Sequence, residues 1–160
     1  MSLRVAPADL DDPRHADAVR ALVDTYARDP MGGGEPLAGA VLDALVPGLR
    51  AHPTTRVFLA WDGDASVGIA VCFLGFTTFE ARPLLNVHDL AVAEGHRRRG
   101  VGRALLEAVE RGARELGCCR VTLEVRQDNA PARALYHDFG LRGERLGGEE
   151  RPMYFLSKPL

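Results

Sequence analysis

A basic loop that contains two glycines is followed by a helix without a capping side chain, and this combination is typical of a site for a phosphorylated ligand. The loop and the first residues of the helix are Arg97, Arg98, Arg99, Gly100, Val101, Gly102 and Arg103. No Ser, Thr, Asp or Asn stands at the start of the helix, so its first N–H groups lack a side-chain acceptor. Glycine lets a ligand approach the main chain, and the helix dipole and the arginines favour a negative charge there. The pattern predicts a pyrophosphate site.

The spacing of this loop differs from two common nucleotide-binding motifs. A Walker A motif needs GxxxxGK[ST], but the loop has no lysine, and a dinucleotide fingerprint needs a third glycine where Leu105 stands. A nucleic-acid patch would need further basic and aromatic clusters, whereas charges of both signs follow on the helix. A solvated basic turn is the plain structural alternative.

Two ionisable residues interrupt an otherwise apolar predicted strand, LLNVHDLAV, and they are His88 and Asp89. A carboxylate in an apolar strand is costly unless it is paired, so we expect Asp89 to be functional or salt-bridged. Histidine is the side chain whose ordinary titration range suits a general base near neutral pH, so His88 is a candidate base, and a packed core histidine is the equal alternative. Neighbours on a strand point to opposite faces, so contact between the two side chains needs a bulge or a bridging water.

Hydrophobic periodicity predicts the strands and helices that must position these residues. We expect strands near residues 2–8, 84–92, 120–125 and 153–157, a two-stranded hairpin at 55–79, and helices near 13–29, 37–51, 101–116 and 130–140. Three consecutive glycines make the segment 29–36 a loop. The order predicts one mixed α/β domain over residues 1–160.

Length and composition restrict the classes of protein to which the chain can belong. At 160 residues and 46% hydrophobic it fits one domain with its own core, and its net charge of −2 argues against a disordered chain or a globally basic nucleic-acid binder. The N-terminus is too polar for a signal peptide, and no apolar run approaches the ~18 residues of a membrane span. We therefore expect a cytoplasmic protein with reduced cysteines, no metal, and no membrane or nucleic-acid partner.

The loop and its flanking segments resemble the acyl-CoA-binding signature of the GNAT superfamily of N-acetyltransferases. That signature is written Arg/Gln-x-x-Gly-x-Gly/Ala, and Arg97, Gly100 and Gly102 stand at its fixed positions, between HDLAV and ALLEAVE. Downstream, LEVRQDNAPARALYHDFGL is similar to the family's strand, Asn and short helix with Leu-Tyr. The likeness covers residues 84–141 and departs from the family at Arg98, where many members have Gly, and at Leu141, where many have Phe.

The resemblance implies an α/β (α+β) fold with one mixed, mostly antiparallel sheet that is splayed between its fourth and fifth strands and flanked by about four helices. In the family, the pantetheine arm of acetyl-CoA lies between the splayed strands and pairs with their free main-chain groups. The acetyl-CoA-binding residues that this implies are Leu90, Ala91, Val92, the loop from Arg97 to Arg103, and Asn129. Asn129 is equally suited to cap the helix that follows it.

The resemblance also implies that an amine attacks the thioester of acetyl-CoA directly. Tyr136 stands at the Leu-Tyr position from which family members protonate the departing sulfur, and simple core packing is its alternative. The attacking amine must lose a proton, and the candidates to accept it are His88, Asp89 and Glu124. An imidazole with an ordinary pKa near ~6.5 would do so around neutral pH.

The segment GFTTFEARPLLNVHDLAV is similar to the GNAT subset that acetylates small diamines and thialysine-type amino acids. In that subset the strand-four pair is Glu-Asp, whereas here it is His88-Asp89, which removes one carboxylate that would attract a second cationic amine. The expected function is transfer of the acetyl group of acetyl-CoA to a primary amine of a small molecule, by a homodimer. A protein N-terminal or lysine acetyltransferase and a non-catalytic acyl-CoA sensor are the alternatives.

Overall fold

Strands and helices are interspersed along the part of the chain that the computed structural model describes, residues 2–143, 145–146, 149–150 and 158–159. In chain order they are β1 (Leu3–Pro7), α1 (Pro13–Arg28), α2 (Gly39–Ala51), β2 (Thr55–Asp62), β3 (Ala65–Thr77), β4 (Arg82–Val92), a 3-10 helix (Glu94–His96), α3 (Val101–Glu115), β5 (Val121–Leu123), α4 (Ala130–Phe139), β6 (Arg145–Leu146) and β7 (Glu149–Glu150). Up to α4, the order agrees with the periodicity of the sequence. The strand expected at residues 153–157 lies outside the described residues.

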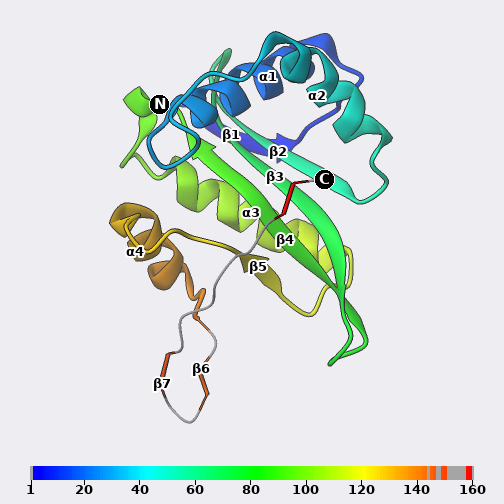
Figure 1. Ribbon diagram of the computed structural model, residues 1–160, viewed down its shortest axis with the longest axis vertical. Coiled ribbons are helices and arrows are strands. Elements are labelled where there is room, and N and C mark those ends of the chain that lie inside the picture. Colours follow the sequence, from blue (N-terminus) through cyan, green and yellow to red (C-terminus); the bar gives the residue numbers. More distant parts are fainter. Residues whose placement is uncertain (1, 144, 147–148, 151–157, 160) are drawn as a thin grey trace.

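The strands β1 to β5 form one mixed sheet and lie in the order of the chain (Figure 1). Neighbours from β1 to β4 are antiparallel, and β5 joins β4 in parallel. The β2–β3 hairpin turns at Gly63, whose φ of 59° is one that other residues adopt only with strain. The mostly antiparallel mixed sheet expected from the sequence is confirmed.

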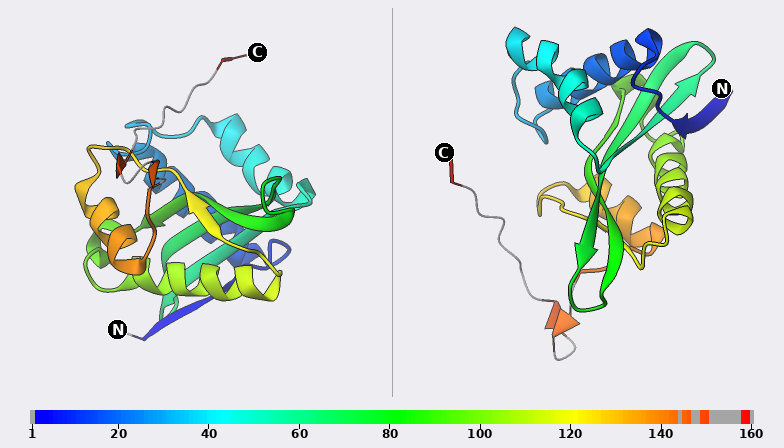
Figure 2. Two further views of the ribbon diagram at one scale, coloured as in Figure 1. Left: turned by 90° about the horizontal axis from the view of Figure 1, so that it is seen from below. Right: turned by 90° about the vertical axis from the view of Figure 1, so that its right-hand side faces the viewer.

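Helices cover both faces of the sheet (Figure 2). On one face, α1 and α2 pack against buried residues of β2 and β3 such as Leu59 and Ile69. On the other face, α3 buries Leu105 and Val109 against Val67, as its amphipathic pattern predicts. No helix within the described residues is both long and apolar enough to cross a membrane.

The strands β4 and β5 are paired over a short stretch and then separate. The parallel register joins Leu85–Val87 to Val121–Leu123. β4 continues to Val92, whereas β5 stops at Leu123, so the fifth strand is shorter than the predicted 120–125. The predicted splay is confirmed, and it leaves the second half of β4 with a free edge among the described residues.

Candidate active site

The free edge of β4 presents the main-chain groups of two residues. The N–H of Ala93 donates to the carbonyl of Val67 on β3 at 2.9 Å, and the main-chain groups of an antiparallel strand alternate in direction. By this alternation Ala91 directs its N–H and C=O toward β3, whereas Leu90 and Val92 direct theirs into the gap beside β5. These are the main-chain groups that the family resemblance assigns to a ligand in the splay.

A β-bulge at His88 turns two ionisable side chains toward the same side of the sheet. The register of β3 against β4 shifts between the pairs Val71–Asp89 and Cys72–Val87, so His88 is the extra residue. His88 meets the ring of Phe73 and Asp89 is paired with Val71, and both partners belong to the apolar cluster on the face that α1 and α2 cover. The bulge that contact between them requires is therefore present.

Asp89 is half-buried on the face of the sheet that α1 and α2 cover. Burial raises the pKa of Asp89, and His88 acts in the opposite sense. Burial raises the pKa of Tyr26 on α1, and the charge of Asp89 acts in the same direction. His88 is exposed, and its ring meets the ring of Phe73 edge-on at 5.6 Å. A half-buried carboxyl beside an accessible imidazole is suited to moving a proton.

Asp89→Asn is expected to stabilise the fold at neutral pH. Because the pKa of Asp89 is raised on folding, the native state holds this proton more tightly than the unfolded chain, whose Asp titrates near ~3.9. The wild type thus loses stability as pH rises from that value through the raised pKa, and the asparagine variant does not. Thermal unfolding followed by circular dichroism should give a higher midpoint for the variant at pH ~7 and similar midpoints below pH ~4.

Asp128→Asn is the matched control for this measurement. Arg126 holds the pKa of Asp128 below its ordinary value, so removing that carboxylate has the opposite sign, and the exposure of the pair keeps the effect small. A lower unfolding midpoint for Asp89→Asn than for the wild type at neutral pH would show that Asp89 stabilises the fold through a favourable pairing.

Tyr136 on α4 is half-buried. Burial and, to a smaller extent, the neighbouring Tyr26 raise the pKa of Tyr136 to about 12. A phenol with this pKa is protonated at neutral pH and can donate its proton. The charge of Asp89 thus acts on the pKa of Tyr26, and Tyr26 acts on the pKa of Tyr136. From the sequence alone, Tyr26 is one of several apolar positions on an amphipathic helix, and nothing singles it out.

Contacts with the start of α3 hold α4 in place. A Cβ at Gly102 would lie 2.9 Å from Leu135 Cδ2, so a larger residue would force the end of the Leu135 side chain to move. The Arg103 guanidinium lies 5.9 Å from the centroid of the Phe139 ring.

Asn129 caps α4, because its Oδ1 accepts a main-chain N–H of the first turn at 3.2 Å. The capping alternative for Asn129 is confirmed, and its contact with acetyl-CoA stays a prediction.

The main chain of the loop before α3 has two residues in the left-handed region. Gly100, with a φ of 85°, is the N-cap of α3, and no side chain of the described residues accepts from the first turn. Arg98 has a φ of 60°, a conformation in which glycine is unstrained, which explains why glycine suits this position. Left-handed residues turn successive N–H groups to one side, as in the nests that bind anions. The geometry suits the predicted pyrophosphate site.

Three of the loop's arginine side chains make contacts within the chain. Arg97 donates through Nη2 to Asp29 Oδ2 at 2.6 Å and through Nε to the Val92 carbonyl at 3.2 Å. Arg103 pairs with a glutamate one turn further along α3 at 3.4 Å, and Arg99 reaches a carbonyl of the 3-10 helix at 3.5 Å. These contacts arrange the loop and its surroundings, so the main-chain amides are the better placed donors for an anion.

The structure changes the importance of two acidic residues, Glu124 and Asp29, relative to the sequence analysis. Glu124, the third candidate to accept a proton, follows the last residue of β5 and is exposed. Asp29 was not singled out, yet it ends α1 and binds Arg97. No local signal distinguishes Asp29 from the other acidic residues near the end of a helix.

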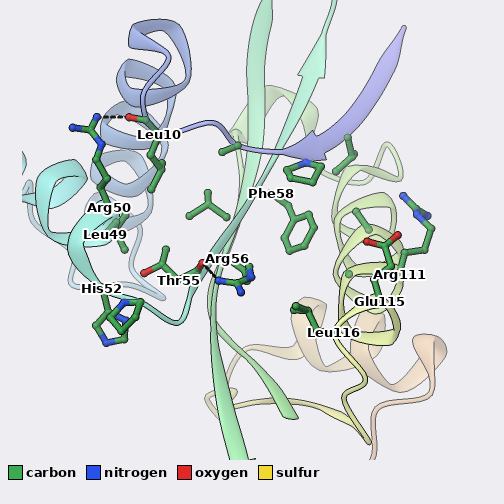
Figure 3. A pocket seen from close by; sticks show the side chains of 17 residues that line it. Leu10, Leu49, Arg50, His52, Thr55, Arg56, Phe58, Arg111, Glu115 and Leu116 are labelled. Carbon is green, nitrogen blue, oxygen red and sulfur yellow. Dashed lines mark hydrogen bonds between the residues drawn. The ribbon is translucent and has the colours of Figure 1, made fainter. Parts of the chain in front are cut away.

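A separate cavity of about 520 Å³ lies beside β2, between the C-terminal halves of α2 and α3 (Figure 3). Two of its three arginines are engaged by main-chain carbonyls, Arg50 by Leu10 and Arg56 by Thr55. Among the described residues, neither β4 nor α4 contributes to its lining. This cavity is distinct from the candidate active site.

The family model described as "Acetyltransferase (GNAT) family" matches residues 19–141. Streptothricin acetyltransferase from Streptomyces lavendulae is 34% identical over 127 residues, which are 79% of this chain and 60% of that protein. The N-alpha-acetyltransferase of Sulfurisphaera tokodaii is 36% identical over 97 residues, 54% of this chain and 57% of that protein. The chain thus spans less than two thirds of the length of these curated relatives.

Solved structures share the fold over nearly the whole chain. A probable acetyltransferase superposes with a TM-score of 0.81 at 21% identity and covers 98% of this chain and 99% of its own. The structure of AAC(6')-Iy in complex with the bisubstrate analogue CoA-S-monomethyl-acetylneamine gives a TM-score of 0.78 at 15% identity, over 100% of both chains. These likenesses confirm the fold expected from the sequence.

Proposed function

The chain belongs to the GNAT family of acetyltransferases, and on this premise we propose that it transfers the acetyl group of acetyl-CoA to a primary amine of a small molecule. The observation that carries the proposal is the free edge of β4 beside the uncapped N-terminus of α3. An extended ligand with amides in its middle and a pyrophosphate at one end matches both features.

Acetyl-CoA is the acetyl donor of this family, and two groups of main-chain atoms are proposed to hold it. The amides from Arg98 to Gly102 bind the pyrophosphate, supported by their left-handed turns. The pantetheine arm pairs with Leu90 and with the N–H of Val92. The Val92 carbonyl already accepts from Arg97, so Leu90 offers the donor and acceptor together. Ala91 directs its main chain toward β3 and lines the site, and the amide of Asn129 contacts the arm.

Three side chains are proposed to move protons during direct attack on the thioester. His88 takes the proton of the attacking ammonium, directly or through water, because it is exposed beside the splay. Asp89, half-buried beside it, orients the amine. Tyr136 protonates the departing thiolate, since its raised pKa of about 12 keeps the phenol protonated.

The acceptor is proposed to be a small, cationic primary amine. Support comes from streptothricin acetyltransferase, which aligns with 79% of this chain, and from the half-buried Asp89 carboxyl near the proposed site. The likeness of the β3–β4 hairpin to the diamine and thialysine subset supports a small amine as the acceptor. His88 stands where that subset has a glutamate, so the second carboxylate of the pair is missing here. Acetylation of a protein N-terminus is the second candidate, favoured by the likeness to an N-alpha-acetyltransferase over 54% of the chain.

The proposed enzyme works as a single domain of residues 1–160, as a homodimer in the cytoplasm. These proposals follow from the length of the chain and from the family resemblance. Size-exclusion chromatography with light scattering measures the assembly directly.

Mass spectrometry of products tests the function. The protein is incubated with acetyl-CoA and a library that mixes small primary amines with short peptides bearing free N-termini, and thiol release is followed in parallel. We expect acetylated small amines that are absent when the protein is omitted. Acetylated peptide N-termini alone would favour the second candidate, and bound acetyl-CoA without thiol release would identify a sensor.

His88→Gln is expected to remove the acidic limb of the pH–rate profile of kcat/KM. Loss of the imidazole leaves the acceptor without its first proton acceptor at neutral pH, so the rate should also fall, by roughly 10- to 10,000-fold. Profiles of the wild type and the variant with the amine found in the library provide the measurement. If the variant keeps the acidic limb and the rate of the wild type, His88 is not the base, and Asp89 or Glu124 is the remaining candidate.

A further inference from the structure

Asp29 connects segments that lie on either side of the proposed active site. It ends α1, where its N–H donates to the Tyr26 carbonyl at 3.0 Å. Its own carbonyl accepts from the N–H of Gly32 at 2.8 Å, and its Oδ1 accepts from the N–H of Met31 at 2.7 Å. Its Oδ2 accepts from Arg97 Nη2 at 2.6 Å. One residue thus shapes the glycine-rich turn, residues 30–36, and holds Arg97, the first residue of the proposed pyrophosphate-binding loop 97–103 (the anion loop).

Arg97 carries the connection on to the free edge of β4. The same guanidinium that binds Asp29 donates through Nε to the carbonyl of Val92, the last residue of β4. The Asp29 side chain is only 15% exposed, whereas the Arg97 side chain is 49% exposed. A charge-assisted hydrogen bond to a shielded carboxylate is stronger and better oriented than an ion pair in open solvent. The contact therefore constrains the loop.

The glycine-rich turn begins beside the end of β4, because Asp29 binds Arg97 and Arg97 in turn donates to the Val92 carbonyl. The turn also follows Tyr26 on α1, whose carbonyl accepts from the N–H of Asp29 at 3.0 Å. The Asp29 carboxylate also acts on Tyr26, whose pKa it helps to raise after burial and Asp89. Order in this turn consequently affects the side of the site that faces the acceptor.

We propose that Asp29 is a positioning residue that couples the two substrate sites. Through Arg97 it fixes the loop that binds the pyrophosphate, and through Met31 it fixes the turn beside the acceptor, so that binding at the loop orders the turn. The inference rests on the proposed function, because it takes the loop as the CoA site.

A double-mutant cycle with coenzyme A as the probe tests the coupling. Asp29→Asn keeps an oxygen for the Met31 N–H and removes the charge that binds Arg97. Isothermal titration calorimetry should show about tenfold weaker binding for Asp29→Asn and for Arg97→Gln, and no further loss in the double variant. The control Glu110→Gln removes an isolated ion pair with Arg114 on α3 and should bind coenzyme A as the wild type does.

Hydrogen exchange of residues 30–36, with and without coenzyme A, provides a measurement that a merely structural role would not change. We expect coenzyme A to slow exchange there in the wild type and not in Asp29→Asn. Failure of the wild type to bind coenzyme A would overturn the proposed function and this inference together. Wild-type binding with equal affinity in Asp29→Asn, or with additive losses in the double variant, would overturn the coupling alone.

Discussion

Gly100→Val is expected to abolish acetyl-CoA binding while the chain stays folded. Gly100 has a φ of 85°, and no described atom lies within 4 Å of the place where its Cβ would be, so valine meets no neighbour. A β-branched residue at this φ costs about 1–3 kcal/mol, which the loop relieves by leaving the left-handed region. The amides of the first turn of α3 then point away from the pyrophosphate. Calorimetry should show a loss of affinity of about a hundredfold or more.

Gly117→Val separates backbone strain from ligand binding. Gly117 has a φ of 70°, its Cβ position is equally open, and it follows the C-terminal end of α3, whereas the loop precedes the N-terminal end. This control should lower the unfolding midpoint about as much as Gly100→Val does and leave acetyl-CoA affinity intact. If folded Gly100→Val protein binds acetyl-CoA with wild-type affinity, the loop has been wrongly assigned.

The anion loop could be predicted from the sequence because its properties are local. An uncapped helix start, glycines and adjacent arginines lie within a few residues, and the structure places Gly100 and Arg98 in the left-handed region. The free edge of β4 follows from the family resemblance rather than from the residues alone. The structure adds the point at which pairing ends, after Val87 and Leu123.

Contacts between distant segments could not be predicted in the same way. Asp29 and Arg97 are 68 positions apart, and their contact depends on where α1 ends above β4. The sequence therefore suggests Arg97 as a free cation for a phosphate, whereas in the structure Asp29 and Val92 engage it. The bulge at His88 depends likewise on the register of the whole β3–β4 hairpin. Sequence reasoning can state that a bulge is required, and only the register places it.

Tyr136→Phe is expected to lower kcat by roughly 10- to 10,000-fold, the range for loss of a general acid. Phenylalanine at this position of α4 keeps the aromatic ring and removes the hydroxyl. Because the pKa of Tyr136 is raised to about 12, this hydroxyl is protonated throughout the neutral range and is a donor in nearly every molecule. Steady-state rates of thiol release should fall, and calorimetry should show little change in acetyl-CoA affinity. Full activity of the variant would make Tyr136 a packing residue.

Tyr26→Phe gives the matched comparison, because Tyr26 is also a half-buried tyrosine whose pKa burial raises. If donation by Tyr136 limits turnover, Tyr26→Phe should lose much less activity than Tyr136→Phe. Equal losses would mean that the rate does not depend on proton donation by Tyr136 in particular.

The pH profile distinguishes the acid from the base. With a pKa of about 12, Tyr136 contributes no limb near neutrality. Its removal should lower the profile without changing its shape, whereas His88→Gln should remove the acidic limb.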